Sequence, residues 1–218
     1  AGNTSTPSTA VTLTVDATAP TTPTINTASG ATNDSTPDIT GTAEAGSTVN
    51  ILQGTTVLGT ATADASGKWT FTPTTPFTDG TYSLTATATD TAGNTSTPST
   101  AVTLTVDATA PTTPTINTAS GATNDSTPDI TGTAEAGSTV NILQGTTVLG
   151  TATADASGKW TFTPTTPFTD GTYSLTATAT DTAGNTSTPS TAVTLTVDAT
   201  APTTPTINTA SGATNDST

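Results

Sequence analysis

In the stretch Tyr82-Ser83-Leu84-Thr85-Ala86-Thr87-Ala88-Thr89-Asp90, an aromatic or apolar side chain stands at every second position from Tyr82 to Ala88, with Ser or Thr between them. Successive side chains of a β-strand point to opposite faces, so this alternation predicts a strand with one buried and one solvated face. Thr suits the solvated face because its branched Cβ favours the extended backbone. The same period of two recurs in 69–73 and 102–106, and no stretch shows a helical period. The sequence therefore predicts an all-β fold.

Clusters of Gly, Asn, Asp, Ser and Pro separate the alternating stretches and predict turns, for example at 27–37, 64–67 and 90–94. Between the turns we predict seven strands in each unit: Pro20–Asn26, Asp38–Ala43, Ser47–Gln53, Val57–Ala63, Lys68–Pro73, Thr81–Thr89 and Ala101–Val106. Seven short strands in about ninety residues are typical of a small antiparallel β-sandwich.

The joint Val106-Asp107-Ala108-Thr109-Ala110-Pro111 also occurs at 15–20 and at 197–202, and the text between the copies repeats without a substitution. The period is 91 residues (107 − 16 = 91), which indicates a tandem array. We expect a piece of a longer linear array with these parts: the last strand of a preceding repeat at 1–16, identical repeats at 17–107 and 108–198, and the start of a further repeat at 199–218.

The composition excludes several classes of function. A net charge of −14 with only Lys68 and Lys159 as cations argues against binding of nucleic acid, which needs clustered Lys or Arg. Without His or Cys, the usual zinc sites and the Ser-His or Cys-His nucleophile pairs cannot be built. No apolar stretch approaches the roughly 20 residues that span a bilayer, so we expect no membrane insertion in this segment. A glycosidase with paired carboxylates would need an aromatic-lined groove, which the sequence does not predict. We therefore predict that the chain is not an enzyme.

Five motifs together run through nearly the whole unit: Val-Asp-x-Thr-Ala-Pro at the joint, and the segments 39–49, 67–71, 79–84 and 88–96. On these motifs the unit resembles the bacterial immunoglobulin-like (Big) repeats stacked in giant secreted adhesins and biofilm-associated surface proteins. The resemblance implies tandem immunoglobulin-like sandwiches, located outside the cell on the bacterial surface. The Cys pair usual in such sandwiches is missing here, whereas Tyr82 has the position of a tyrosine corner.

Two sets of three carboxylates are candidates for a cation site: Asp16, Glu44 and Asp90, and one unit further on Asp107, Glu135 and Asp181. In a seven-strand sandwich of this type, the loops after the second strand and before the last strand lie at the pole where the chain enters. Each linker Asp is thus expected near the Glu and Asp of the following repeat. Ligands that are all oxygen select a hard ion, and Ca²⁺ takes six to eight of them. The resemblance implies calcium as well, since related repeats hold it at their junctions. The alternative is an ordinary solvated acidic surface.

Other features allow more than one interpretation. Asp34, Asp38 and Asp79 are expected at the opposite pole, where they form a second, weaker site, join the next linker Asp, or only shape turns. Trp69 and Phe71 could stack on a sugar, but alternating strand positions are more typical of core residues. Regular Thr rows suggest binding to ice, but twisted strands interrupted by Pro loops do not offer a flat array.

The leading functional interpretation is a structural spacer or stalk repeat of a bacterial extracellular adhesin or surface fibre, stiffened by calcium at its joints. Identical units favour this interpretation. Repeats that recognise ligands are expected to diverge in sequence, whereas the length of a spacer depends only on the number of repeats. The expected partners are neighbouring repeats of the same chain and other copies of the fibre. The alternative is that the repeats themselves adhere to a surface or associate laterally.

Overall fold

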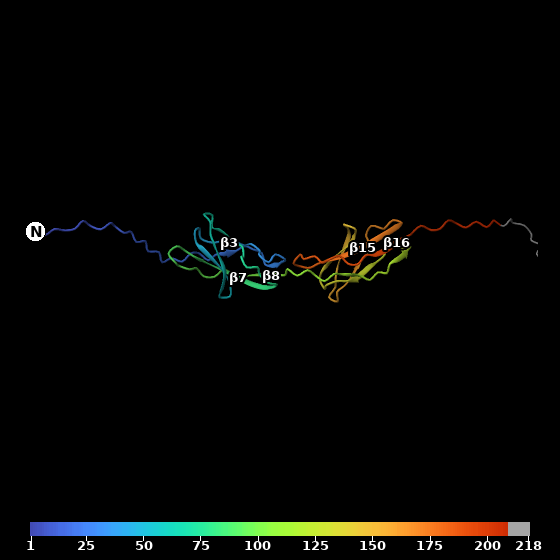
Figure 1. Cartoon of the computed structure of the whole chain (residues 1–218), viewed down its shortest axis with the longest axis horizontal. Coiled ribbons are helices and arrows are strands. Elements are labelled where there is room, and N and C mark those ends of the chain that lie inside the picture. Colours follow the sequence, from blue (N-terminus) through green and yellow to red (C-terminus); the bar gives the residue numbers. More distant parts are fainter. Residues whose placement is uncertain (209–218) are drawn as a thin grey trace, which may run out of the picture. The chain divides into compact units, whose positions relative to one another are not determined.

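The computed structural model describes residues 1–208 of the protein, and within them it contains strands and no helix. The chain folds as two compact units. Of the described residues, the first unit contains 1–110 together with 181–186, and the second contains 111–180 and 187–208. Figure 1 shows the strands of both units along the chain, with β3, β7 and β8 labelled in the first and β15 and β16 in the second. The all-β sandwich class predicted from the alternating pattern is confirmed.

Each repeat is built from two sheets in the same order. The strands of the first are β1 (Thr24–Ile25), β2 (Gly30–Thr32), β3 (Ile39–Thr42), β4 (Thr48–Gln53), β5 (Thr56–Thr62), β6 (Lys68–Phe71), β7 (Gly80–Thr89) and β8 (Val102–Val106). They form a three-stranded sheet of order β1-β3-β6 and a five-stranded sheet of order β2-β8-β7-β4-β5.

The second repeat reproduces this arrangement with β9 (Thr115–Ile116), β10 (Gly121–Thr123), β11 (Ile130–Thr133), β12 (Thr139–Gln144), β13 (Thr147–Thr153), β14 (Lys159–Phe162), β15 (Gly171–Thr180) and β16 (Val193–Val197). Its sheets have the orders β14-β11-β9 and β10-β16-β15-β12-β13. The repeats share their sequence and their sheet orders, so a strand pairing described within one repeat has its counterpart 91 residues away in the other.

Strand β2 lies in the segment 27–37, which the sequence predicts as a long turn. It pairs in parallel with β8, with Gly30 opposite Leu104 and Thr32 opposite Val106. The three residues of β2 are small or polar and show no alternation, so the local sequence does not predict this strand. The sandwich therefore has eight strands, one pair of which is parallel, instead of the seven antiparallel strands predicted. The predicted first strand 20–26 shortens to β1 because Pro20 and Pro23 cannot donate to a sheet ladder.

The core lies between the two sheets and consists of the inward residues of each alternating strand. In the first repeat the buried cluster contains Ile39, Val49, Ile51, Trp69, Phe71, Leu84, Ala86, Leu104 and Val106. The Trp69 side chain is only 2% exposed, so its predicted inward position is confirmed. Its ring lies over Gly41, the residue opposite it on β3, where no side chain stands in the way. Without disulfides, this packing is the main source of stability.

Tyr82 forms the tyrosine corner that its position predicts. Its hydroxyl donates to the carbonyl oxygen of Thr78, four residues earlier, at 2.8 Å. Its ring contacts Phe77 with centroids 4.5 Å apart. The corner ties the loop before β7 to the strand and so positions Asp79, which lies between them.

Candidate functional site

The structure brings together the three acidic residues predicted around the first joint. Asp16, Glu44 and Asp90 line one open pocket of about 120 Å³, with Ala45, Gly46, Ser47 and Thr91 as the other lining residues. Asp16 belongs to the linker that enters the repeat, Glu44 follows β3, and Asp90 follows β7. Three loops separate in sequence therefore meet at one place, as expected from the sandwich topology.

Glu44 sits in a tight turn that leaves its carboxylate exposed. Its backbone carbonyl accepts hydrogen bonds from the Ser47 amide at 3.1 Å and from the Ser47 hydroxyl at 2.7 Å. Gly46 has a φ of +80°, a left-handed conformation that favours glycine. The backbone is thus fixed, while the Glu44 side chain keeps its rotamer freedom.

Asp90 caps its own loop. Its Oδ1 accepts from the amides of Ala92 and Asn94, each at 2.9 Å, and its Oδ2 accepts from the Asn94 side chain at 2.8 Å. The side-chain bond from Asn94 is the largest cause that lowers the pKa of Asp90, because donors to a carboxylate favour its charged form.

Asn94 also holds the entering linker. Its Nδ2 donates to the carbonyl oxygen of Asp16 at 3.1 Å, in addition to its bond to Asp90. The Asp16 carboxylate in turn accepts from the Thr18 amide at 3.0 Å. Sequence analysis did not select Asn94 as a site residue, although the spacing Asp-x-x-x-Asn in this turn, Asp90 to Asn94, was the signal available.

The other three predicted residues lie on the expected elements. Asp107 directly follows β8, donates its amide to the Thr32 carbonyl at 3.0 Å, and accepts from the Thr109 amide at 3.1 Å. Glu135 follows β11 in a turn of the same kind as that of Glu44, and its backbone carbonyl accepts a hydrogen bond from the Ser138 hydroxyl.

Asp181 follows β15, and its carboxylate caps its loop like that of Asp90. Its Oδ1 accepts from the amide of Asn185 at 2.9 Å and its Oδ2 from the Asn185 side chain at 2.8 Å. Burial opposes ionisation of Asp181, but the hydrogen bonds from Asn185, Gly184 and Ala183 outweigh it, and the pKa is lowered.

The donor chemistry of these residues fits a hard cation, but their placement is not that of a formed metal centre. Among residues 1–208, no group of three acidic side chains is gathered closely enough to hold a metal ion. Both oxygens of Asp90 face donors of its own loop, and Glu44 extends into solvent. A cation at this pocket would require the Glu44 and Asp16 side chains to turn toward Asp90.

A second linker contact lies at the other end of the repeat. The Asp79 carboxylate accepts from the Ala108 amide at 2.8 Å and from the Thr109 hydroxyl at 2.6 Å. The bond from Ala108 is the largest cause that lowers the pKa of Asp79, followed by the bond from Thr109. The second repeat shows the same arrangement, with Asp170 accepting from Ala199 and Thr200. We call this arrangement of Asp79 with residues 108 and 109 the exit clamp.

Of the remaining acidic residues that sequence analysis considered, Asp34 and Asp64 serve turns. Asp34 accepts from the Thr36 amide at 2.8 Å, and Asp64 accepts from the amides of Ser66 and Lys68. Asp38 accepts from the Thr72 hydroxyl. Asp79 differs from them because its partners lie on the linker that leaves the repeat.

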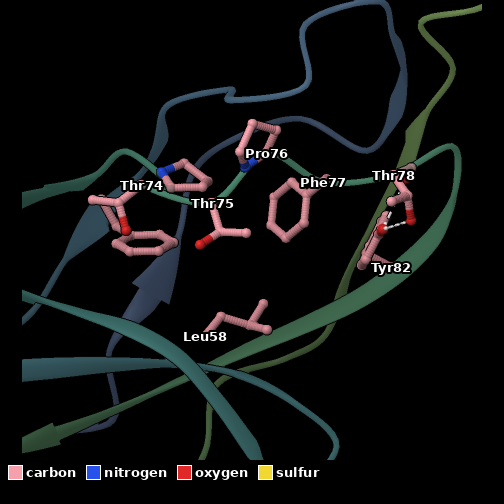
Figure 2. A pocket seen from close by; sticks show the side chains of 9 residues that line it. Leu58, Thr74, Thr75, Pro76, Phe77, Thr78 and Tyr82 are labelled. Atoms are coloured by element: carbon pink, nitrogen blue, oxygen red, sulfur yellow. Dashed lines mark hydrogen bonds between the residues drawn. The ribbon is translucent and has the colours of Figure 1, made fainter.

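Each repeat also has an aromatic-lined pocket, which sequence analysis did not expect. In the first repeat it has a volume of about 230 Å³ and lies beneath the loop 73–78, between Leu58 of β5 and Tyr82 of β7. Figure 2 shows Thr75 and Phe77 facing Leu58 across this space. The lining contains Phe71, Pro73 and Pro76 but no carboxylate, so it lacks the acid pair that glycoside hydrolysis needs.

A comparison with family models identifies the repeats. The model of the bacterial Ig-like domain matches residues 21–108 and again residues 112–199. The chain belongs to the bacterial Ig-like domain family. The resemblance inferred from the joint and strand motifs is thereby confirmed, and both Ig-like repeats of the chain are covered.

A comparison with solved structures found chains that are similar to this one, and a TM-score above 0.5 with the first of them shows a shared fold. The fibronectin(III)-like modules of Clostridium thermocellum CbhA are 21% identical, with a TM-score of 0.53, and the match covers 80% of this chain and 93% of that one. The BSP domain of a biofilm-associated protein is 28% identical with a TM-score of 0.34, over 83% of this chain and 30% of that one. The Yersinia pseudotuberculosis adhesin InvE is 19% identical with a TM-score of 0.32, over 81% and 58%. Among curated protein sequences, none matches the chain significantly. No helix among the described residues is long and apolar enough to cross a membrane.

Proposed function

We propose that these Ig-like repeats are structural spacers of a bacterial extracellular adhesin or surface fibre, and that their joints are stiffened to keep the array extended. The observation that carries this proposal is the exit clamp, in which Asp79 binds the first two residues after Asp107. A flexible tether would leave these linker residues solvated, whereas the clamp makes them part of the folded repeat. The linker also contains no Gly and ends in Pro111, which further limits its freedom.

The entering linker supports the same role. Asn94 holds the carbonyl of Asp16, and Pro20 at the end of this linker is buried in the repeat. The repeats are identical in sequence, so every linker of the array has an exit clamp from the repeat before it and an Asn partner from the repeat after it.

Calcium is the proposed second source of stiffness. One Ca²⁺ would bind at each joint, to Asp16, Glu44 and Asp90 at the first and to Asp107, Glu135 and Asp181 at the second. The pocket shared by the first three residues supports this, as does the absence of His and Cys from the chain. Three carboxylates, completed by carbonyl oxygens and water, are expected to give a dissociation constant of about 10⁻⁴ to 10⁻³ M. At about ten times that concentration the ion would add roughly 1.4 kcal/mol per joint.

Small-angle X-ray scattering tests both parts of the proposal. A spacer requires the maximum dimension to grow in proportion to the number of repeats, and an array that becomes compact as repeats are added would contradict it. With calcium we expect a stiffer array than with a chelator, and we expect Glu44→Gln with Glu135→Gln to abolish the difference. The matched control is Asp64→Asn with Asp155→Asn, which removes the same charge from hairpin turns outside the pocket. Scattering curves that are the same with calcium and with a chelator would refute the calcium site, but they would not contradict the spacer role.

A further inference from the structure

Asp79 and Asp170 differ from the other aspartates of the chain in the residue that follows them. Each precedes a glycine, Gly80 or Gly171, whereas Ala, Ser, Thr or Ile follows every other Asp. The backbone nitrogen of a glycine approaches the preceding carboxyl carbon most easily, because glycine has no side chain to obstruct the approach. The two Asp-Gly peptides are therefore the places where the main chain is most prone to rearrange.

The rearrangement needs only water. The Gly80 N–H and the protonated carboxyl group of Asp79 lose one water molecule as the nitrogen bonds to Cγ, which closes a five-membered cyclic imide. Water then adds to one of the two carbonyl carbons and breaks its bond to the nitrogen. When the original backbone carbonyl is the one that opens, the chain runs on through Cβ and Cγ, and a free carboxylate remains on Cα. One water leaves and one enters, so the product, isoaspartate, is an isomer of the starting chain.

The exit clamp opposes this reaction at Asp79. Ring closure requires the carboxyl carbon to swing over the Gly80 nitrogen and to release an oxygen. In the structure Oδ1 is held by the Ala108 amide at 2.8 Å and Oδ2 by the Thr109 hydroxyl at 2.6 Å. The bond from Ala108, and after it the bond from Thr109, also lowers the pKa of Asp79, so the protonated form that can lose water is scarce.

The tyrosine corner restrains the same peptide from the other side. The bond from the Tyr82 hydroxyl to the Thr78 carbonyl closes the segment 78–82 around Asp79 and Gly80 (Figure 2). Both Asp79 and Gly80 are exposed, so water reaches the peptide, and what restrains it is the clamp and the corner. The peptide should therefore react mainly during the intervals in which the linker is detached.

We propose that Asp79 and Asp170 are sites of isoaspartate formation, and that the exit clamp controls the modification by protecting each Asp-Gly peptide while the linker is bound. The second repeat has the same restraints: Asp170 accepts from Ala199 and Thr200, and the Tyr173 hydroxyl donates to the Thr169 carbonyl. The modification then marks a joint that has opened. The inference rests on the clamp and does not depend on a spacer role.

Isoaspartate at position 79 would release the linker permanently. The main chain gains one carbon atom, and the carboxylate moves from Cβ to Cα, so its oxygens no longer reach Ala108 and Thr109 as they do in the clamp. The extra atom also lies inside the segment 78–82 that the tyrosine corner closes. An opened joint that has isomerised therefore cannot form its clamp again.

The two lysines allow the two sites to be measured separately. Cleavage after Lys68 and Lys159 places Asp79 in the peptide 69–159 and Asp170 in the peptide 160–218. The whole chain is incubated at neutral pH, either folded or in guanidinium chloride, and isoaspartate is located by isoaspartyl methyltransferase labelling and fragmentation of the peptides. In denaturant the two sites should react alike and before any other Asp. In the folded chain both should react at least about tenfold more slowly, because only the open fraction reacts.

Thr109→Val is the decisive variant, because it removes one donor of the clamp and keeps a branched side chain. In the folded chain it should raise the rate at Asp79 at least about threefold, while Asp170 keeps its rate and serves as the internal reference. The matched control is Thr105→Val, which removes a hydroxyl that lies 3.3 Å from that of Thr81 and outside the clamp. It should leave both rates unchanged.

Equal rates in the folded and the denatured chain would overturn the proposal, as would equal rates at Asp79 in Thr109→Val and Thr105→Val. Isoaspartate that forms first at another Asp in denaturant would overturn it as well. Release of the linker has its own measurement: the isomerised chain, isolated by chromatography, should exchange the Ala108 amide hydrogen faster than the parent chain. Unchanged protection of Ala108 would contradict permanent release. The spacer role is tested by scattering, so failure of either proposal can be recognised separately.

Discussion

Gly41 is the position at which the structure makes its sharpest prediction about stability. A Cβ atom on Gly41 would lie 1.9 Å from the carbonyl oxygen of Thr24 and 2.3 Å from Cζ2 of Trp69. Neither neighbour can move away easily. The carbonyl group of Thr24 belongs to a strand that is paired within the sheet, and the Trp69 ring is held in the core with only 2% of the residue exposed. Gly41→Ala must therefore push β1 away from β3 or turn the Trp69 ring out of the core.

The expected cost follows from the atoms that would clash. Overpacking a well-packed core costs about 1 to 3 kcal/mol, and we expect the upper end because a backbone carbonyl is involved. For a domain of this size, 1 kcal/mol corresponds to about 4 to 8 °C in melting temperature. Gly41→Ala should therefore lower the melting temperature of the first repeat by about 12 to 24 °C.

The chain provides its own reference for this measurement. With Gly132 left unchanged, the second repeat has the parent sequence, so calorimetry should show one transition for the parent chain and two for Gly41→Ala. Gly30→Ala is the matched control, because a Cβ there meets no atom within 4 Å. A Gly41→Ala chain that melts in one transition within about 2 °C of the parent would refute the packing argument, and so would an equal loss in Gly30→Ala.

Two further predictions concern the core and the exit clamp. Trp69→Ala should cost about 3 to 5 kcal/mol in chemical denaturation, as for other buried large aromatic side chains, and a loss below about 1 kcal/mol would mean that Trp69 packs little. At the clamp, Asp79→Asn should speed amide hydrogen exchange of Ala108, whereas Asp64→Asn should not, and equal exchange rates in the two variants would contradict the clamp. The Asp79 pKa is lowered from 3.8 by its bonds to Ala108 and Thr109. The clamp's contribution is therefore complete above about pH 4 and is lost as the pH falls through the lowered pKa, which NMR titration of the Ala108 amide can follow.

The local features of the fold could be predicted from the sequence because they depend on consecutive residues. The alternation in 69–73 and 82–90 fixes which side chains face the core, so the inward positions of Trp69 and Leu84 and the all-β class followed from it. The tyrosine corner at Tyr82 was also accessible, since its partner Thr78 is only four residues away. The motifs of the joint and the strands identified the family because they recur at fixed spacing within one unit.

The meeting of the three acidic residues in one pocket was predicted from topology. The hydrogen-bond donors that their carboxylate oxygens face were not predicted. That Asp16, Glu44 and Asp90 meet follows from the order of strands in a sandwich of this kind. Which donors their oxygens face depends on loop conformation, and there Asn94 proved to be the residue that connects Asp90 with the entering linker. Calcium at this pocket stays a prediction.

Only the tertiary structure decided the features that join distant parts of the chain. Strand β2 exists because Gly30 lies beside Leu104, and the clamp exists because Asp79 lies beside Ala108. Neither contact can be predicted from a local sequence pattern. The segment on each side has the residues of an ordinary turn or strand, whether or not the distant segment lies beside it. Periodicity determines which face of a strand is buried, but the meeting of two segments is set by how the whole core closes around them.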